Sequence, residues 1–144
     1  MIRRKKPIKR SSPPRARRPK KFGTHRERVK YLNEIWRRLI YLKSPNGRCL
    51  ICKTGKGNQA AHIFAKGPYP HMRFDLDNGV PLCVPCHRRF DGDNAWGYEW
   101  RQTLLGDPDT YERMKLRSVG RGKTDLQLVR LHLEAAAKAA GVVF

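Results

Sequence analysis

The sequence predicts an α+β fold that is mainly helical and carries one small β element, and three observations support this prediction. Apolar residues recur at steps of three and four in several segments, which is typical of amphipathic helices. Four cysteines form two Cys-x2-Cys pairs, which indicates a core stapled by a metal ion. The chain has 144 residues, enough for one compact domain with tails, and so small a core usually needs such a staple.

The chain begins with a segment that we expect to be a disordered basic arm, residues 1–23. Residues 1–22 hold eleven Lys and Arg and no acidic residue, and four prolines discourage a helix. The arm either contacts phosphates or acts as a solubilising or targeting tail.

Four helices are predicted after the arm from apolar periodicity and from their start and stop signals. In order they cover about 25–42 (N-cap Thr24), 94–105 (stop at Gly106), 107–116 (starting at Asp107-Pro108) and 124–140 (starting at Thr124). The β element is expected at the cysteines. The domain organisation that follows is an N-terminal helix at 24–46, a central domain at 47–118, and a linker with the C-terminal helix at 119–144.

The net charge of +20, from 32 Lys+Arg against 12 Asp+Glu, calls for a polyanionic partner. Nucleic acid is the first candidate; an anionic membrane surface is the second, but no apolar run approaches the length needed to cross a bilayer. No apolar stretch follows the basic start as it would in a secretory signal, so a cytoplasmic location is expected. We expect no membrane and no small-molecule cofactor, and the sequence leaves a homodimer open.

The four cysteines are the clearest candidate site. A Cys-x2-Cys turn presents two thiolates on the same side of a tight loop, and two such turns complete a tetrahedron around Zn²⁺. Because four sulfurs leave no open position, we expect a structural zinc, which would contribute on the order of 10 kcal/mol to folding. The alternatives are unconnected buried thiols or a redox pair, although no thioredoxin-like context is present. The four ligands are Cys49, Cys52, Cys83 and Cys86.

The segment between the cysteine pairs contains His62 and Asn78, and His87 follows the second pair at once. With this order of His, Asn and His, residues 49–93 resemble the HNH family of endonucleases, in the variety stapled by structural zinc. Residues 60–100 are similar, more narrowly, to the phage recombination nucleases NinG and Rap. The resemblance implies a ββα-metal (HNH) core and metal-dependent hydrolysis of DNA phosphodiester bonds, with branched or recombining DNA as the substrate, in a bacterial or phage-infected cell.

The resemblance also implies a role for each of these three residues. His62 matches the histidine that activates water as a general base, and Asn78 matches the residue that ties the connecting loop and orients that histidine. His87 matches a ligand of a divalent ion, Mg²⁺ or Mn²⁺, which polarises the scissile phosphate.

One departure from the family concerns the second ligand of that ion. Many members carry Asp or His immediately before the first histidine, where this chain has Ala61. Asp91, four residues after His87, would share its helix face and is the expected substitute. Asp75 and Asp77 are other sources of oxygen ligands.

Four basic residues are candidates for contacts with the nucleic acid: Lys66, Arg73, Arg88 and Arg89. Lys66 belongs to the loop after His62, where a neighbouring glycine permits close approach of the backbone. Arg73 is expected either to clamp a phosphate or to pair with Asp75. Arg88 and Arg89 either face a docked phosphate or form a solvated surface.

Several other side chains leave two interpretations open. The aromatic residues Trp96, Tyr98 and Trp100 either stack on bases or pack into the core. His71 either touches substrate or is solvated, whereas His25 and His132 are expected to be surface or packing residues. For the whole chain, the rivals of a nuclease are a non-catalytic zinc-stapled nucleic-acid-binding protein and a basic assembly factor whose arm binds nucleic acid or a protein partner.

Overall fold

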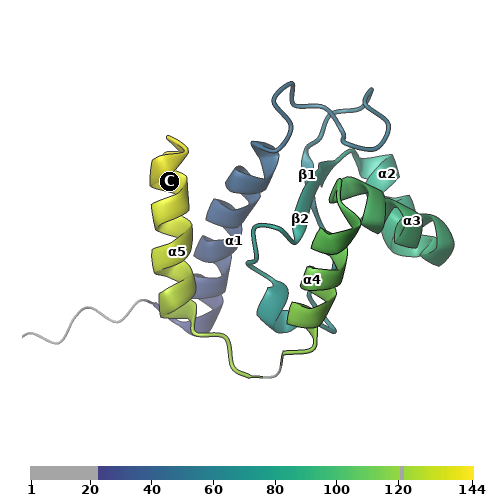
Figure 1. Ribbon diagram of the computed structural model, residues 1–144. Helices are drawn as coiled ribbons and strands as arrows, with labels where there is room; N and C mark the ends of the chain where they lie inside the picture. The colour runs from purple at the N-terminus through teal and green to yellow at the C-terminus, as the bar shows by residue number, and fades with distance from the viewer. Residues whose placement is uncertain (1–22, 121) are drawn as a thin grey trace, which may run out of the picture.

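The computed structural model describes residues 23–120 and 122–144, so the predicted arm, apart from residue 23, lies outside the described residues. The described part contains five α-helices, one short 3-10 helix and a two-stranded antiparallel sheet (Figure 1). This mainly helical arrangement with a small sheet confirms the predicted fold class. None of the helices in the described part is long and apolar enough to cross a membrane.

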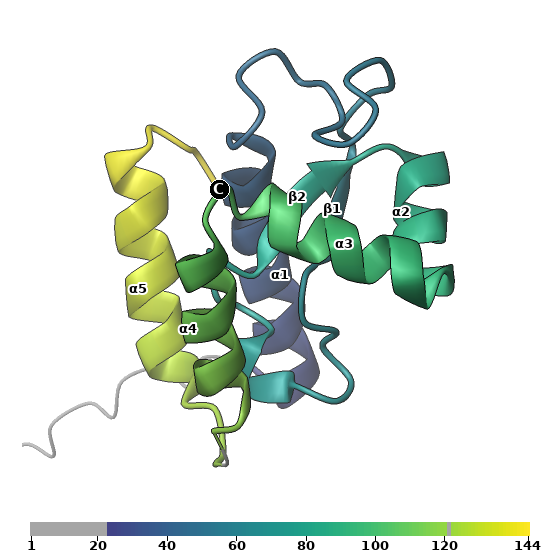
Figure 2. The ribbon, with the colours of Figure 1, turned by 45° about the vertical axis from the view of Figure 1, so that its right-hand side comes forward.

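Helix α1 (His25–Tyr41) starts at a reciprocal cap. The Thr24 hydroxyl accepts a hydrogen bond from the Glu27 amide, and the Glu27 carboxylate accepts one from the Thr24 amide at 2.7 Å. The apolar stripe of α1 packs against α5 (Leu126–Ala139), and the Tyr31 hydroxyl donates to Glu134 at 2.7 Å. The two helices lie side by side in Figure 1, and Figure 2 shows them from a second direction. Their contact forms the first core, composed of Leu32, Ile35, Trp36, Leu39, Ile40, Phe74, Leu133 and Ala137.

The last helix starts two residues later than predicted, at Leu126 rather than at Thr124. The N-cap is Asp125, whose carboxylate accepts hydrogen bonds from the Gln127 and Leu128 amides at 2.9 and 3.2 Å. A carboxylate that reaches two free amides is a stronger cap than a threonine hydroxyl, because its charge also complements the helix dipole.

The sheet consists of β1 (Gln59–His62) and β2 (Gly79–Leu82), which pair with Ala61 opposite Val80 and His62 opposite Gly79. Because side chains alternate between the faces of a strand, Ala61 and His62 point to opposite sides. The His62 side faces α1. There a Cβ on Gly79 would lie 2.5 Å from side-chain atoms of both Trp36 and Ile40, so only glycine allows α1 to pack this closely.

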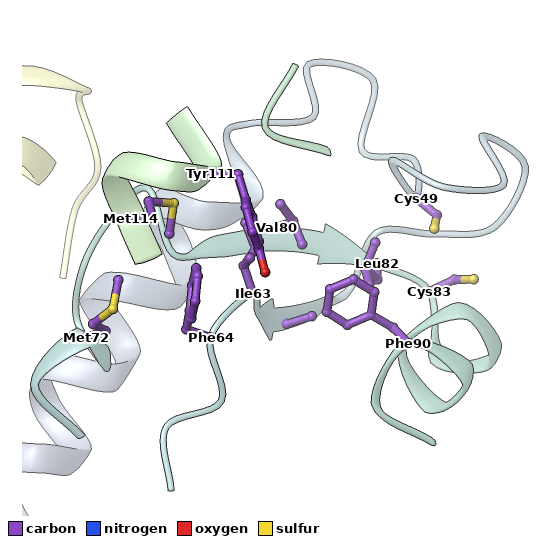
Figure 3. Close-up of a cluster of buried hydrophobic side chains, with 11 residues drawn as sticks. Cys49, Ile63, Phe64, Met72, Val80, Leu82, Cys83, Phe90, Tyr111 and Met114 are labelled. Atoms are coloured by element: carbon purple, nitrogen blue, oxygen red, sulfur yellow. The ribbon is translucent and has the colours of Figure 1, made fainter. Parts of the chain in front are cut away.

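The opposite face of the sheet borders a second core, in which the sheet and the loop after β1 meet three helices and the 3-10 helix η1 (Pro70–Met72). These helices are α2 (Val84–Gly92), α3 (Asn94–Leu104) and α4 (Pro108–Ser118), which runs two residues beyond the predicted end. Asp93 and Asp107 cap α3 and α4. Figure 3 shows the second core, whose buried residues are Cys49, Ala61, Ile63, Phe64, Met72, Val80, Leu82, Cys83, Phe90, Tyr111 and Met114.

The three aromatic residues of α3 were expected either to pack into the core or to stack on bases, and they differ in their environment. Trp96 and Trp100 are partly buried and pack against the second core, which agrees with a packing role. Tyr98 is 53% exposed, although its ring meets the edge of Tyr111 at 6.2 Å between centroids. The described structure therefore uses the two tryptophans to attach α3 to the domain.

Candidate metal centre and active site

The four cysteines converge on one point at the end of the second core. Cys49 and Cys52 come from the loop after α1, Cys83 is the N-cap of α2, and Cys86 lies in its first turn. Their sulfur atoms all lie within 4.8 Å of one another, and the Cys52 and Cys83 sulfurs are 3.8 Å apart. A tetrahedron with Zn–S bonds of about 2.3 Å has edges of about 3.8 Å. This donor set therefore fits Zn²⁺, with no ligand position left for substrate.

The backbone around the first cysteine pair holds the sulfurs in place. The Cys49 amide donates to the Gly55 carbonyl at 2.8 Å, and the Gly55 amide points at the Cys52 sulfur at 3.4 Å. A Cβ on Gly55 would lie 2.8 Å from the Cβ of Cys83, so glycine allows the two cysteine loops to meet. Lys53 accepts a left-handed conformation, with φ of 61°, to close this turn.

The electrostatics of the thiols also favours a cation. The hydrogen bond from the Thr54 hydroxyl, helped by the Gly55 and Thr54 amides, lowers the pKa of Cys52 to about 5. Burial raises the pKa of Cys83, and burial together with the neighbouring thiols raises that of Cys86. One thiolate is therefore stabilised and further ones are opposed, so a divalent ion among the sulfurs would supply the missing positive charge.

A second site is a cleft of about 690 Å³ between α1, β1, the loop after β1, α2 and α3. It brings together four predicted residues that are far apart in sequence: His62, Lys66, His87 and Asp91. Three polar residues that also line the cleft were not predicted as site residues: Asn33, Arg37 and Arg101. Histidines and a carboxylate thus share one concave surface with several cations.

His62 is held in one orientation by two contacts. Its Nε2 lies 2.9 Å from the Arg73 carbonyl oxygen, and its ring stacks on Trp36 with 4.3 Å between centroids and 10° between planes. Because a carbonyl oxygen can only accept, Nε2 must carry the proton of the neutral ring. The lone pair of Nδ1 is then left for another partner, as a general base requires.

The surroundings of His62 keep this imidazole neutral. Burial lowers the pKa of His62 below its ordinary value of 6.5, and the positive charges of Lys66 and Arg73 lower it further, against the opposing effects of the Arg73 carbonyl and Asp91. The ring can therefore accept a proton at neutral pH.

His87 and Asp91 meet on one face of α2, as their spacing predicts. His87 Nε2 and a carboxylate oxygen of Asp91 are 3.2 Å apart, and α2 continues to Gly92, so its last turn still holds Asp91 in register. One imidazole nitrogen and one carboxylate oxygen form a partial ligand set that fits a divalent ion such as Mn²⁺ or Mg²⁺ and leaves positions for phosphate and water.

Asn78 is completely buried and does not face the cleft. Its Oδ1 accepts from the Phe64 amide at 2.7 Å, and its Nδ2 donates to the carbonyls of Phe64 and Met72, each at 3.0 Å. These bonds tie together the two ends of the loop that follows β1 and carries Lys66. In this geometry Asn78 is a positioning residue rather than one that touches substrate.

The alanine in place of an acid has a structural explanation in this chain. Ala61 is completely buried in the second core, on the face of β1 opposite to His62. A carboxylate there would lie among apolar side chains and would not reach the cleft, because neighbouring residues of a strand point to opposite faces. A ligand from position 61 is therefore incompatible with this packing.

The predicted alternative oxygen ligands, Asp75 and Asp77, lie outside the cleft. Both carboxylates bind the guanidinium of Arg117 from α4, each at 3.1 Å. Of the two alternatives for Arg73, the pairing with Asp75 is not seen, because Arg117 takes that position. Arg73 instead donates to Asn33 at 3.3 Å and lies over the Phe74 ring.

Three further candidates, Arg88, Arg89 and His71, are not among the residues that line the cleft. Arg89 stacks over Trp96 at 4.4 Å and approaches Asp93 at 3.7 Å, which places it on the α3 side of α2. Arg88 is exposed on α2. His71 donates from Nε2 to the Arg117 carbonyl at 3.0 Å, so it joins η1 to α4.

Arg101 is a cleft residue that reasoning from the sequence missed. Its Nε donates to the Ile63 carbonyl at 2.9 Å and its Nη2 to the Phe90 carbonyl at 3.2 Å, with the guanidinium 4.4 Å from the centre of the Phe90 ring. It therefore links the end of β1, which carries His62, to α2, which carries His87. The signal available in the sequence was an arginine directly after Trp100, in a helix whose tryptophans were expected to pack or to stack on bases.

Comparison with known protein families gives a match over the segment that contains both sites. Residues 49–93 match the family model HNH_2, described as HNH endonuclease. The match confirms the resemblance of this segment to HNH endonucleases, whereas the likeness to NinG and Rap stays a prediction. No curated protein and no solved structure matches the chain.

Proposed function

We propose that the chain is a metal-dependent DNA endonuclease in which His62 is the general base and His87 and Asp91 hold the divalent ion. The observation that carries this proposal is the shared cleft: a neutral histidine with a free Nδ1 lines the same surface as a histidine–aspartate pair at 3.2 Å. The HNH endonuclease match over residues 49–93 supports a nuclease with nucleic acid as substrate.

The proposed reaction is hydrolysis of a phosphodiester bond. Nδ1 of His62 takes a proton from the water that attacks phosphorus, while Trp36 and the Arg73 carbonyl hold the ring in place. A divalent ion bound by His87 and Asp91 would polarise the phosphate and stabilise the leaving oxygen. Lys66 and Arg37 neutralise phosphate charge at the edge of the cleft. The products expected from the resemblance are a 5′-phosphate and a 3′-hydroxyl.

The cysteine site has a separate, structural task in this proposal. Cys83 and Cys86 lie at the start of α2, with Cys86 directly before His87, while β2 ends at Leu82. A zinc ion that joins them to Cys49 and Cys52 would therefore fix the start of α2 relative to the sheet. The distance between the base and the ligand pair would then depend on this staple.

The test is a cleavage assay with matched variants. Supercoiled plasmid and a four-way junction are incubated with the protein in Mg²⁺ or Mn²⁺ and then in EDTA. Cleavage should require the ion and should fall by a factor of about 10² or more in His62→Ala. His132→Ala, an exposed histidine on α5 outside the cleft, is the control and should cleave normally. Metal-independent cleavage, or full activity in His62→Ala, would contradict the proposal.

The preference for branched or recombining DNA, and action in a bacterial or phage-infected cell, rest on the resemblance to NinG and Rap. Cleavage of a four-way junction should exceed that of a linear duplex with the same arms. Equal rates would remove the branched substrate from the proposal and leave the nuclease in place.

The second candidate is a zinc-stapled protein that binds nucleic acid without cutting it. It is favoured by the small ligand set of the cleft, because Ala61 faces the core and Asp75 and Asp77 bind Arg117. Tight binding of DNA with no cleavage in any divalent ion would support this candidate instead.

A further inference from the structure

Helix α1 carries a row of polar side chains that neither core uses. Arg26, Lys30, Asn33 and Arg37 follow one another at steps of four, three and four, so they lie on one face of the helix. The three cations are exposed and Asn33 is half-buried. We call these four residues the basic stripe.

The basic stripe is continuous with the cleft. A groove of about 380 Å³ is lined by the whole stripe together with Val29 and Glu34. The cleft that holds His62 and His87 is lined by two of the same residues, Asn33 and Arg37. The groove therefore starts in the first turn of α1 and opens into the cleft at the level of Trp36.

The charge along this groove is positive. Among the described residues that line it, Glu34 is the one acidic residue, and its carboxylate is neutralised by Arg38 at 3.1 Å. Arg37 is held at the entrance of the cleft by bonds from its guanidinium to the Tyr41 hydroxyl, at 3.1 and 3.3 Å. Lys66 continues the row of cations on the far side of the cleft.

We propose that the basic stripe binds the phosphate backbone of the DNA strand that enters the cleft. The inference that the strand continues to the reacting atoms rests on the proposed function. Arg26 and Arg37 are about 16 Å apart along the helix, at about 1.5 Å per residue. A strand of duplex DNA presents a phosphate every 3.4 Å or so along its axis, so the stripe spans about five nucleotides. The eleven basic residues of 1–22 precede this end of α1 in the sequence.

Salt dependence of binding tests the stripe directly. A labelled DNA duplex is titrated with the full chain, loaded with zinc and without other divalent ions, between about 50 and 200 mM salt. The variant is Arg26→Ala with Lys30→Ala. The matched control is Lys115→Ala with Lys138→Ala, which removes the same charge from exposed positions on α4 and α5.

Each phosphate contact adds about 0.9 to the slope of log affinity against log salt, so the stripe variant should lose between about one and two from its slope. Its affinity at the lowest salt should fall at least tenfold. The control should change the slope by less than about 0.5. Equal slopes in the stripe variant and the control would overturn the proposal, as would a loss of affinity with no change in slope.

Two further measurements keep this result separate from folding and from catalysis. Circular dichroism checks the helices, and Arg26→Gln with Lys30→Gln repeats the test if the alanine variant unfolds. Cleavage is measured on the same preparations. A fall in slope without cleavage by the parent protein would support the stripe and reject the nuclease; cleavage with an unchanged slope would reject the stripe alone.

Discussion

Replacing Asn78 with aspartate should destabilise the protein almost as much as removing the side chain. Asn78 is completely buried, and it accepts one hydrogen bond and donates two. Aspartate has the same shape and still accepts from the Phe64 amide. It cannot donate to the carbonyls of Phe64 and Met72, which lie 3.0 Å from Nδ2, so two buried carbonyl oxygens would face a carboxylate.

The magnitude follows from these groups. The Phe64 carbonyl would be left without a partner, which costs about 1–3 kcal/mol. The Met72 carbonyl keeps its bond from the Asp75 amide at 3.2 Å and loses only the second bond, at about 0.5–1.5 kcal/mol, so the two together cost about 1.5–4.5 kcal/mol before the charge is considered. Such a loss is a large fraction of the stability of a small domain, about 5–15 kcal/mol. Because the buried carboxyl would have a raised pKa, the variant should regain stability relative to the parent as the pH falls toward that pKa, when the protonated group can donate one bond.

Urea unfolding with excess zinc measures these effects, with Asn78→Ala as the reference for complete removal. Asn94→Asp, at an exposed position in the first turn of α3, is the control and should change the free energy of unfolding by less than about 0.5 kcal/mol. A loss of less than about 1 kcal/mol in the free energy of unfolding of Asn78→Asp would refute the reasoning. So would a loss in Asn78→Asp that depends on pH no more than the loss in Asn78→Ala does.

Three further predictions concern packing, metal and pH. Gly79→Ala places a Cβ 2.5 Å from Trp36 and Ile40, so it should cost about 1–3 kcal/mol in urea unfolding, whereas Gly67→Ala, with no atom within 4 Å, should cost less. Metal analysis should find one zinc per chain, and Cys52→Ser should lower both the zinc content and the midpoint of thermal unfolding; a zinc-free chain of equal stability would contradict the staple. Because the pKa of His62 lies below 6.5, kcat/KM for cleavage should stay high at pH values below 6.5. Lys66→Met removes a charge that lowers this pKa, so the fall of kcat/KM at acid pH should shift to higher pH; an unchanged fall would contradict the effect of Lys66 on His62.

Local features of this fold could be predicted from the sequence because their chemistry lies within one turn of chain. The cap of α1 needs only Thr24 and Glu27, three residues apart, and the start of α4 needs only Asp107 and Pro108. The pairing of His87 with Asp91 follows from helical spacing alone. Each cysteine pair is likewise a short turn that places its own two sulfurs on one side, whereas the meeting of the two pairs depends on the fold.

The remainder of the site depends on contacts between distant segments, for which no local signal exists. Trp36 has the spacing of a core residue, and nothing nearby in the sequence shows that one face of its buried ring stacks on His62. Arg117 displaces Arg73 from Asp75 because α4 packs beside η1, a fact of tertiary structure. A strand over these residues would predict that Ala61 and His62 point to opposite faces. That an acid at position 61 would be buried follows only once the second core is known to cover the Ala61 face.

The sheet lies between the two cores, and each core supports a different part of the proposed active site. His62 rests on Trp36, which belongs to the first core, whereas His87 and Asp91 flank Phe90, which belongs to the second. Packing units of this kind can open separately, with different free energies. Opening of either core would separate His62, the proposed proton acceptor, from His87 and Asp91, the proposed ion ligands, while the other core stayed folded. Heat should therefore abolish cleavage at a lower temperature than that at which the helical signal disappears.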